Sequence, residues 1–190
     1  MRKFLRSIDF WDLLLAISCL AIFLYAAMFV PNFVSGFNLS QLAASASEKA
    51  LLILPMTLLI ITREIDLSIA SVLALTSVIF GLLVQAGMPT LAAIPLTLVA
   101  GGLLGAFNGY LVSGLGLQSL VVTLGTMALY RGIGYILLGT GSVNILPPAV
   151  VDFGINNLPG TEIPWTIVPF LVLAPVFAVI LQKTPTGKRI

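Results

Sequence analysis

Six predominantly apolar runs divide this chain, and most of them are long enough to cross a lipid bilayer as a helix. An α-helix rises about 1.5 Å per residue, so roughly 20 apolar residues span the ~30 Å hydrocarbon core of a bilayer. The runs lie at residues 13–30, 48–62, 67–85, 91–112, 120–138 and 165–182. They predict an all-α fold, a polytopic transmembrane helix bundle of about six spans, in one membrane domain over residues 1–190. A cleaved signal peptide has a shorter apolar region, so we expect the first run to remain as a span.

The composition excludes most other classes of protein. Hydrophobic residues make up 59% of the 190 residues and charged residues 8%, whereas soluble domains carry about 25% charged residues. The formal net charge is +2, and there is no basic face for nucleic acid. With no histidine and one cysteine, Cys19, the sequence excludes an intrachain disulfide, a His/Cys metal cluster and a histidine-based triad. We therefore expect this chain to have no catalytic residues and no cofactor or metal of its own.

A charged stretch interrupts the second and third runs. Arg63, Glu64 and Asp66 fall within four positions, and each charge inside hydrocarbon costs about 2.5–3.5 kcal/mol. The stretch is therefore expected at a membrane edge, in a polar cavity or in ion pairs. Asp66 precedes a helix-like run and can cap it, because a carboxylate accepts free N–H groups at a helix start. Two interpretations stay open: a static cap in a tight cytoplasmic turn, or a gating cluster of Arg63, Glu64, Asp66 and Ser68 whose ion pairs change.

Small and polar residues inside the later runs suggest further roles. Gly101, Gly105 and Gly109 recur every four residues, and small residues at this spacing let membrane helices approach closely. We predict that these glycines serve helix packing. Pro55 is expected to kink the second span, because proline removes a backbone hydrogen bond.

Four side chains in the fourth and fifth runs are candidates for lining a transport pathway: Asn108, Thr123, Thr126 and Arg131. Amide and hydroxyl groups suit a sugar, although hydrogen bonding between helices is the favoured explanation for Asn108 and the threonines. Arg131 lies within an apolar run, where it must reach the interface, pair with a carboxylate or face a cavity.

The connections between the runs differ in character. Residues 33–47 are rich in serine and asparagine and are predicted to form a loop or an interfacial segment. Residues 139–164 form the longest polar connection, with the carboxylates Asp152 and Glu162 and no basic residue, and long connections are often binding loops.

The basic residues set an orientation for the six spans. With the N-terminus in the cytoplasm, Lys49 near the outer end of the second span is the residue that runs against the positive-inside rule. The residues that agree with the rule are Arg2, Lys3, Arg6, Arg63, Lys183, Lys188 and Arg189. We therefore expect a multi-pass protein of the bacterial inner membrane with a cytoplasmic N-terminus, in which residues 139–164 face outward.

Residues 61–75 resemble the G-x-IDLSVGS…L signature of the sugar-type ABC importer permeases, the membrane subunits that serve ribose, xylose, arabinose, rhamnose and the furanosyl autoinducer. Further stretches match in the same order: residues 101–109 with Asn108, residues 120–127 with Arg131 and Gly132, and residues 184–189. Glu64 and Ala70 stand where many members have glycine, a departure that resembles the rhamnose branch.

The resemblance implies a larger permease fold of which this chain is the N-terminal portion, since family members continue with further spans. It implies a permease subunit that moves a monosaccharide, such as rhamnose or another pentose or deoxyhexose. The implied partners are an ABC ATPase subunit that carries ATP and magnesium, a periplasmic sugar-binding protein and a second permease subunit. The ATPase-coupling loop then includes Thr184, Gly187, Lys188 and Arg189. In agreement, the chain contains no Gly-x-x-x-x-Gly-Lys-Ser/Thr loop of its own.

An alternative from another class is an ion-coupled secondary transporter. Such transporters use intramembrane carboxylates and broken helices near the middle of the bilayer. Glu64 and Asp66 supply the carboxylates and Pro55 the break in this interpretation. Their place at a predicted membrane edge argues against it.

Overall fold

A computed structural model describes residues 10–184 and Gly187 of the chain. The described part is helical, with one isolated antiparallel bridge between Asn157 and Pro164, and the predicted all-α fold is confirmed. The elements are α1 (Phe10–Phe29), α2 (Gly36–Ile61), α3 (Ile69–Gln85), α4 (Thr90–Gly109), the π-helical segment η2 (Tyr110–Gly114), α5 (Ser119–Leu138), α6 (Pro148–Ile155) and α7 (Ile167–Lys183).

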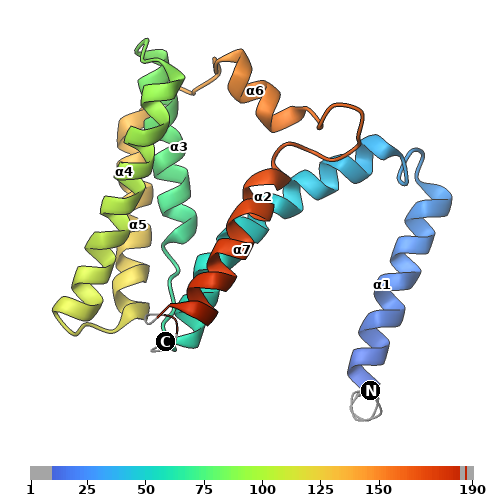
Figure 1. Cartoon of the computed structure of the whole chain (residues 1–190), viewed down its shortest axis with the longest axis horizontal. Coiled ribbons are helices and arrows are strands. Elements are labelled where there is room, and N and C mark those ends of the chain that lie inside the picture. The colour runs from blue at the N-terminus through green and yellow to red at the C-terminus, as the bar shows by residue number, and fades with distance from the viewer. Residues whose placement is uncertain (1–9, 185–186, 188–190) are drawn as a thin grey trace.

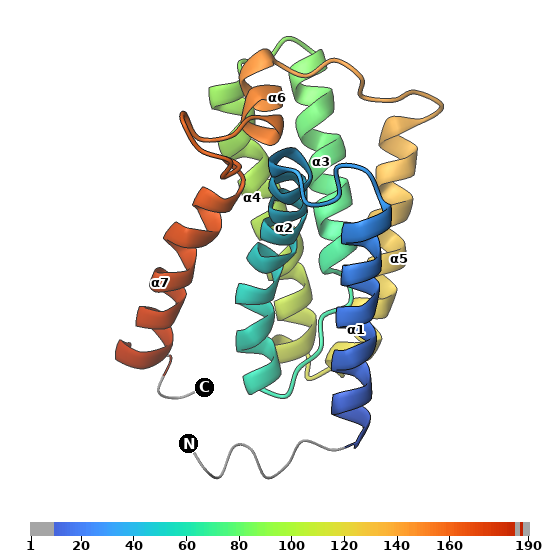
Figure 2. The same ribbon diagram turned by 90° about the vertical axis from the view of Figure 1, so that its right-hand side faces the viewer.

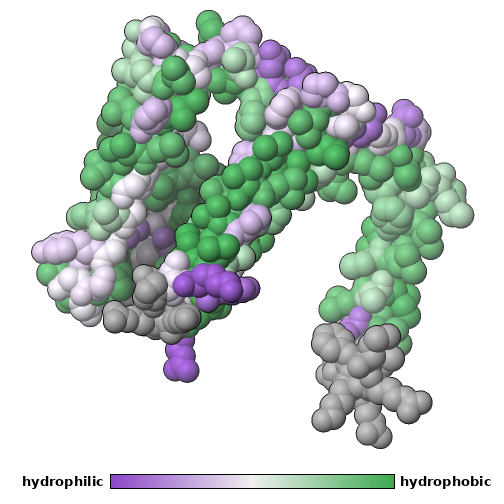
Figure 3. Space-filling model, viewed as in Figure 1, coloured by the Kyte–Doolittle hydropathy of each residue, from purple (hydrophilic) through white to green (hydrophobic). Residues whose placement is uncertain are grey.

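Four of these helical stretches are long and apolar enough to cross a membrane: α1, α2, α4 continued by η2, and α5. Helices α3 and α7 are also apolar but shorter, with 17 residues each. Apolar side chains cover the sides of the helices, and hydrophilic side chains gather toward the ends (Figure 3). Such an apolar surface suits a bilayer rather than water. The helical backbone is also compatible with hydrocarbon, because its polar groups form hydrogen bonds within each helix. The chain therefore has the architecture of a multi-pass membrane protein.

The helices form two groups (Figure 1). In the first, α3 packs against both α4 and α5; in the second, α2 packs against α7. Helix α1 stands apart and has no buried residue, and α6 lies across one end of the molecule (Figure 2). The buried apolar core is small and comprises Ala44, Leu75, Ala93, Val122 and Tyr130.

Helix α2 begins at Gly36, before the expected start near residue 48 and before the alternative start near Leu42. The loop interpretation of residues 33–47 is therefore wrong for most of that segment, and the interfacial interpretation stays a prediction. Ser35 caps the helix, because its Oγ accepts a 3.3 Å hydrogen bond from the Asn38 backbone N–H. Within the helix, Ser40 Oγ donates to Asn157 Oδ1 at 2.6 Å, and Ser47 Oγ lies 3.2 Å from Thr166 Oγ1. Serine weakens an isolated helix by competing for hydrogen bonds, but here these hydroxyls bond to the segment between α6 and α7.

Candidate functional site

The segment between α2 and α3, residues 62–68, is called the linker below. Helix α2 ends in a Schellman motif, in which the N–H of Glu64 bonds to Leu59 O at 2.9 Å and that of Arg63 to Ile60 O at 3.0 Å. Arg63 has a φ of 63°, in the left-handed region that favours glycine. The linker therefore starts with a backbone turn that the sequence makes without a glycine, and the Arg63 side chain is exposed.

Asp66 holds the second half of the linker. Its Oδ1 accepts hydrogen bonds from the backbone N–H and from the Oγ of Ser68, both at 2.7 Å. Helix α3 then starts at Ile69, with Ser68 O accepting from the N–H of Ser71 and of Val72. This geometry matches the static turn, but the predicted helix cap is wrong, because Asp66 accepts from the N-cap residue Ser68 and not from the first N–H groups of α3. The gating cluster stays a prediction, and Arg63 and Glu64 lie beside Asp66 in the chain.

A line of hydrogen bonds continues from Asp66 into the helices. Asn108 Nδ2 on α4 donates to Ser68 Oγ at 2.8 Å, and Tyr130 Oη on α5 donates to Asn108 Oδ1 at 3.0 Å. The hydroxyl of Tyr130 also lies 2.9 Å from Leu104 O. Ser68, Asn108 and Tyr130 are 0%, 6% and 2% exposed. Asp66, Ser68, Asn108 and Tyr130, named the polar chain here, thus join the linker to α4 and α5.

Thr123 and Thr126 are buried on α5 beside the linker. Thr123 Oγ1 lies 2.9 Å from Ser119 O and 3.3 Å from Ile65 O, and Ser119 Oγ accepts from the N–H of Ile65 at 3.4 Å. Thr126 Oγ1 donates to Thr123 O at 3.4 Å. Thr123 therefore connects α5 to the linker. Such a contact is what the interhelical hydrogen-bonding alternative predicts.

A cavity of about 350 Å³ opens between the linker, α4, η2 and α5. It is called the linker cavity, and its lining includes Glu64, Asp66, Gly105, Asn108, Gly109 and Thr123. The fold thus brings two residues of the charged stretch together with two of the pathway candidates at one end of the molecule. This is the end where α1 begins and α7 finishes (Figure 1).

The three regularly spaced glycines have different surroundings. A Cβ added to Gly101 would lie 3.3 Å from Thr76 Cγ2, so α3 and α4 approach closely there. Among the described residues, nothing lies within 4 Å of a Cβ at Gly105 or Gly109. Gly101 therefore has the predicted packing environment, whereas Gly105 and Gly109 border the linker cavity.

The remaining candidates lie elsewhere. Arg131 is exposed on α5, at the edge of a cavity of about 140 Å³ that Tyr130 and Tyr135 also line. At the end of α7, Thr184 Oγ1 donates to Ile180 O at 2.6 Å and accepts from the N–H of Gly187 at 3.1 Å. Thr184 and Gly187 thus form a capped turn, and Lys188 and Arg189 lie outside the described residues.

Sequence reasoning missed Tyr130, the buried member of the polar chain that lies on α5. A signal for it exists, because Thr123, Thr126, Tyr130 and Gly134 follow one another at intervals of three or four and are all buried. Residues at this spacing share one face of a helix. Such a stripe of polar and small residues in an apolar helix predicts its contact face, and Tyr130 lies in the middle of it.

Comparison with known proteins gives matches over most of the chain. A family model described as "Branched-chain amino acid transport system / permease component" matches residues 38–190. The autoinducer 2 import system permease protein LsrD of Yersinia enterocolitica is 38% identical over 143 residues, which cover 72% of this chain and 43% of the relative. The protein of the same name from Yersinia pestis is 36% identical over 143 residues, with 72% and 42% covered. The chain thus spans less than half the length of these relatives. No solved structure matches it.

Proposed function

The chain belongs to the family of sugar-type ABC importer permeases, and from this premise we propose that it contributes helices to the transport pathway of a bacterial importer for a monosaccharide or a related furanosyl compound. The observation that carries the proposal is the family match from residue 38 onward, which takes in almost all of α2 and every later helix. The membrane in question is the bacterial inner membrane. The chain's share in transport is movement of helices, and ATP hydrolysis belongs to a partner.

The matches are named after two different classes of solute. The name of the family model refers to branched-chain amino acids, whereas the names of the relatives refer to autoinducer 2. A free amino acid carries two charges, and a buried charge needs an opposite charge or several strong hydrogen bonds. The buried polar groups among the described helices are hydroxyls and an amide, which favours a neutral, hydroxyl-rich solute. L-rhamnose is one candidate, because Glu64 and Ala70 resemble the rhamnose branch.

In the proposed mechanism, two permease subunits enclose the pathway, and each partner favours one of two helix arrangements through differential binding. A solute-binding protein docks at the outer face, where Asp152 and Glu162 lie on the connection between α5 and α7. An ATPase with its ATP and magnesium binds the opposite end, at the loop that begins with Thr184 and Gly187 and continues with Lys188 and Arg189. The N-terminus lies on the ATPase side.

The linker is the part that we propose to respond to the ATPase. It lies at the same end of the molecule as the last turn of α7 (Figure 1), and the polar chain carries any movement of Asp66 to α4 and α5. In the other helix arrangement, Arg63 and Glu64 are free to form the ion pairs of the gating hypothesis. Arg131, exposed in the middle of α5, is placed against the pathway or the second subunit, because a lipid-facing arginine is costly.

The test is co-expression of the chain with the genes that flank its own, followed by purification in a mild detergent. We expect an ATPase subunit to co-purify, and a sugar-loaded binding protein to stimulate its turnover. Purification without an ATPase, together with uptake that follows an ion gradient, would reject the proposal in favour of ion-coupled transport.

A double substitution separates the two mechanisms further. Glu64→Gln with Asp66→Asn removes both carboxylates of the linker cavity and keeps the side chains nearly isosteric. In an ABC permease, transport that remains in this variant depends on ATP and ignores the ion gradient, even where loss of the linker carboxylates slows it. Loss of all ion coupling in this variant, with ATP irrelevant from the start, would identify a secondary transporter.

A further inference from the structure

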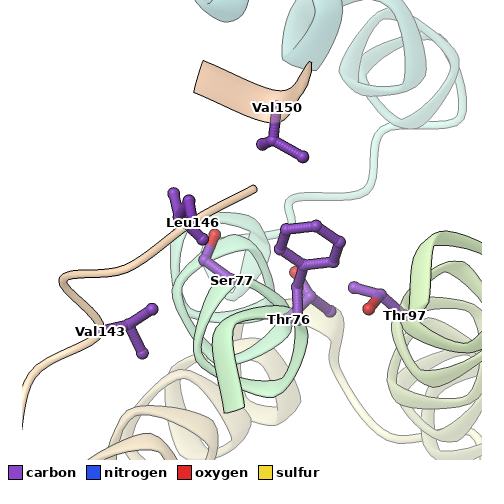
Figure 4. A pocket seen from close by; sticks show the side chains of 7 residues that line it. Thr76, Ser77, Thr97, Val143, Leu146 and Val150 are labelled. Atoms are coloured by element: carbon purple, nitrogen blue, oxygen red, sulfur yellow. The ribbon is translucent and has the colours of Figure 1, made fainter. Parts of the chain in front are cut away.

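A second cavity, of about 460 Å³, lies between α3, α4 and the segment that follows α5. Thr76 and Ser77 of α3 and Thr97 of α4 face it from one side, and Val143, Leu146 and Val150 close the other (Figure 4). Its volume falls within the roughly 300–1,000 Å³ of small-molecule sites. It is called the hydroxyl cavity below, and it is separate from the linker cavity, with which it shares no lining residue.

The three hydroxyl groups of this cavity donate their protons to backbone carbonyl oxygens of their own helices. Thr76 Oγ1 and Thr97 Oγ1 each lie 2.8 Å from the carbonyl oxygen four residues earlier, and Ser77 Oγ lies 2.8 Å from Leu73 O. A hydroxyl has one proton and two acceptor positions. What these side chains can offer to a ligand is therefore hydrogen-bond acceptance.

This chemistry selects among solutes. An anion brings further acceptors and has no donor to meet, and no charged side chain is among the residues that line the cavity. A zwitterion or a cation finds no opposite charge, so its desolvation is uncompensated. A sugar hydroxyl, in contrast, donates to each of these oxygens. Phe80 and the three aliphatic residues offer an apolar surface to the C–H groups of a sugar ring.

Two close contacts hold the walls in place. A Cβ added to Gly81 would lie 2.6 Å from Val143 Cγ1, so the segment after α5 sits directly on the α3 backbone. At Gly101, a Cβ would lie 3.3 Å from Thr76 Cγ2, so α4 confines the Thr76 side chain. Both glycines are therefore positions where a larger residue would alter the shape of the cavity.

We propose that the hydroxyl cavity is a binding subsite for a neutral, hydroxyl-rich solute, with Thr76, Ser77 and Thr97 as acceptors of its hydroxyl protons. Val150 of α6 lines the cavity, and α6 lies at the end of the bundle away from the linker (Figure 1). This is the outer end in the orientation set by the basic residues, so a solute released by a binding protein meets this subsite early. The inference rests on the proposed permease function and adds a place and a chemistry to it.

The test is protection of an engineered cysteine in the assembled transporter. In a Cys19→Ser background, Leu146→Cys places one thiol at the cavity wall and leaves all three hydroxyls intact. A membrane-impermeant methanethiosulfonate labels the thiol, and the labelling rate is measured against D-ribose, L-rhamnose, the furanosyl autoinducer, D-ribonate and L-leucine. We expect at least one of the three neutral compounds to slow labelling and D-ribonate and L-leucine to leave it unchanged.

The hydroxyls are then removed by Thr76→Val with Thr97→Val, which keeps the side-chain shape. We expect the half-protection concentration to rise about tenfold, as for the loss of two hydrogen bonds. Thr57→Val is the matched control, because the Thr57 hydroxyl also bonds to the carbonyl four residues earlier, on the exposed side of α2 away from the cavity. It should leave protection within about twofold.

Absence of protection by every neutral compound, or equal protection by D-ribonate, would overturn the subsite. An unchanged half-protection concentration in the double valine variant would also overturn it. Should that variant fail to assemble, Ser77→Ala supplies the same comparison, with a rise of about threefold expected for one hydrogen bond. Labelling needs no ATP turnover, so it is read separately from binding-protein-stimulated ATP hydrolysis. Stimulated hydrolysis without protection refutes the subsite alone, and absence of both refutes the proposed function as well.

Discussion

The contact between Asn108 and Tyr130 supplies a thermodynamic test of the polar chain. Tyr130→Phe removes the hydroxyl that lies 3.0 Å from Asn108 Oδ1 and 2.9 Å from Leu104 O. Leu104 O keeps its helical hydrogen bond, but Asn108, which is 6% exposed, is left with an acceptor that has no donor. An unsatisfied buried group costs about 1–3 kcal/mol, and hydrogen bonds measured within membrane proteins average about 0.6 with a maximum near 1.7 kcal/mol. We expect a loss of about 1–1.5 kcal/mol.

The substitution of the other partner, Asn108→Leu, should cost less, although it also removes two polar contacts. Asn108→Leu keeps the number and branching of the side-chain heavy atoms and leaves no buried donor without an acceptor. The Tyr130 hydroxyl can turn its proton to Leu104 O, which lies 2.9 Å away, and Ser68 still donates to Asp66. We expect a loss of about 0.5–1 kcal/mol. In the Asn108→Leu background, Tyr130→Phe no longer strands an amide oxygen, so the double variant should show a coupling free energy of about 1 kcal/mol.

The measurement is unfolding by sodium dodecyl sulfate in mixed micelles, followed by far-UV circular dichroism, for the wild type, both single variants and the double variant. Tyr135→Phe is the control, because Tyr135 lies on the same helix and is 69% exposed. It should change stability by less than about 0.5 kcal/mol. A coupling within about 0.3 kcal/mol of zero, or a larger loss for Asn108→Leu than for Tyr130→Phe, would refute the reasoning.

Three further substitutions test other parts of the fold by the same unfolding assay. Arg63→Gly should stabilise the protein by up to about 1 kcal/mol, because the position has a φ of 63°, and a loss would contradict the Schellman assignment. Gly105→Ala should gain up to about 1 kcal/mol of helix propensity in open space. Gly101→Ala should gain nothing or lose stability, because its Cβ meets a side chain at 3.3 Å, and equal effects at both positions would exclude the close contact. Asp66→Leu should cost about 1–2 kcal/mol by removing the acceptor of both Ser68 hydrogen bonds, whereas Asp66→Asn, which keeps an acceptor oxygen, should cost less than half as much.

The parts of this fold that sequence predicts best are those decided by local hydrophobicity. Helices α1 and α5 lie close to the apolar runs at residues 13–30 and 120–138, because each run is long and predominantly apolar. The turn at Asp66 was also predictable, because a carboxylate just before an apolar run finds free N–H groups within reach, but its partner is Ser68, which precedes α3, and not an N–H group of the helix itself.

The parts that sequence predicts poorly depend on contacts between distant residues. The first half of α2 has the composition of a loop, and its serines become compatible with a helix through Asn157 and Thr166, more than a hundred positions away in the chain. Likewise, among the described residues, Thr76 of α3 lies against Gly101 and nothing lies within 4 Å of a Cβ at Gly105. No local pattern contains that information.

The polar chain also has a direction, and the carboxylate sets it. Ser68 gives its single hydroxyl proton to Asp66, so its oxygen is left to accept, and Asn108 must turn its NH₂ group toward it. The amide oxygen then faces α5, and Tyr130 must act as a donor. Each hydrogen-bond direction follows from the one before it, so a single carboxylate sets the orientation of three side chains on three separate segments. A group at position 66 that donates to Ser68 would require all three hydrogen bonds to change direction, so we expect the three side chains to respond to such a change together.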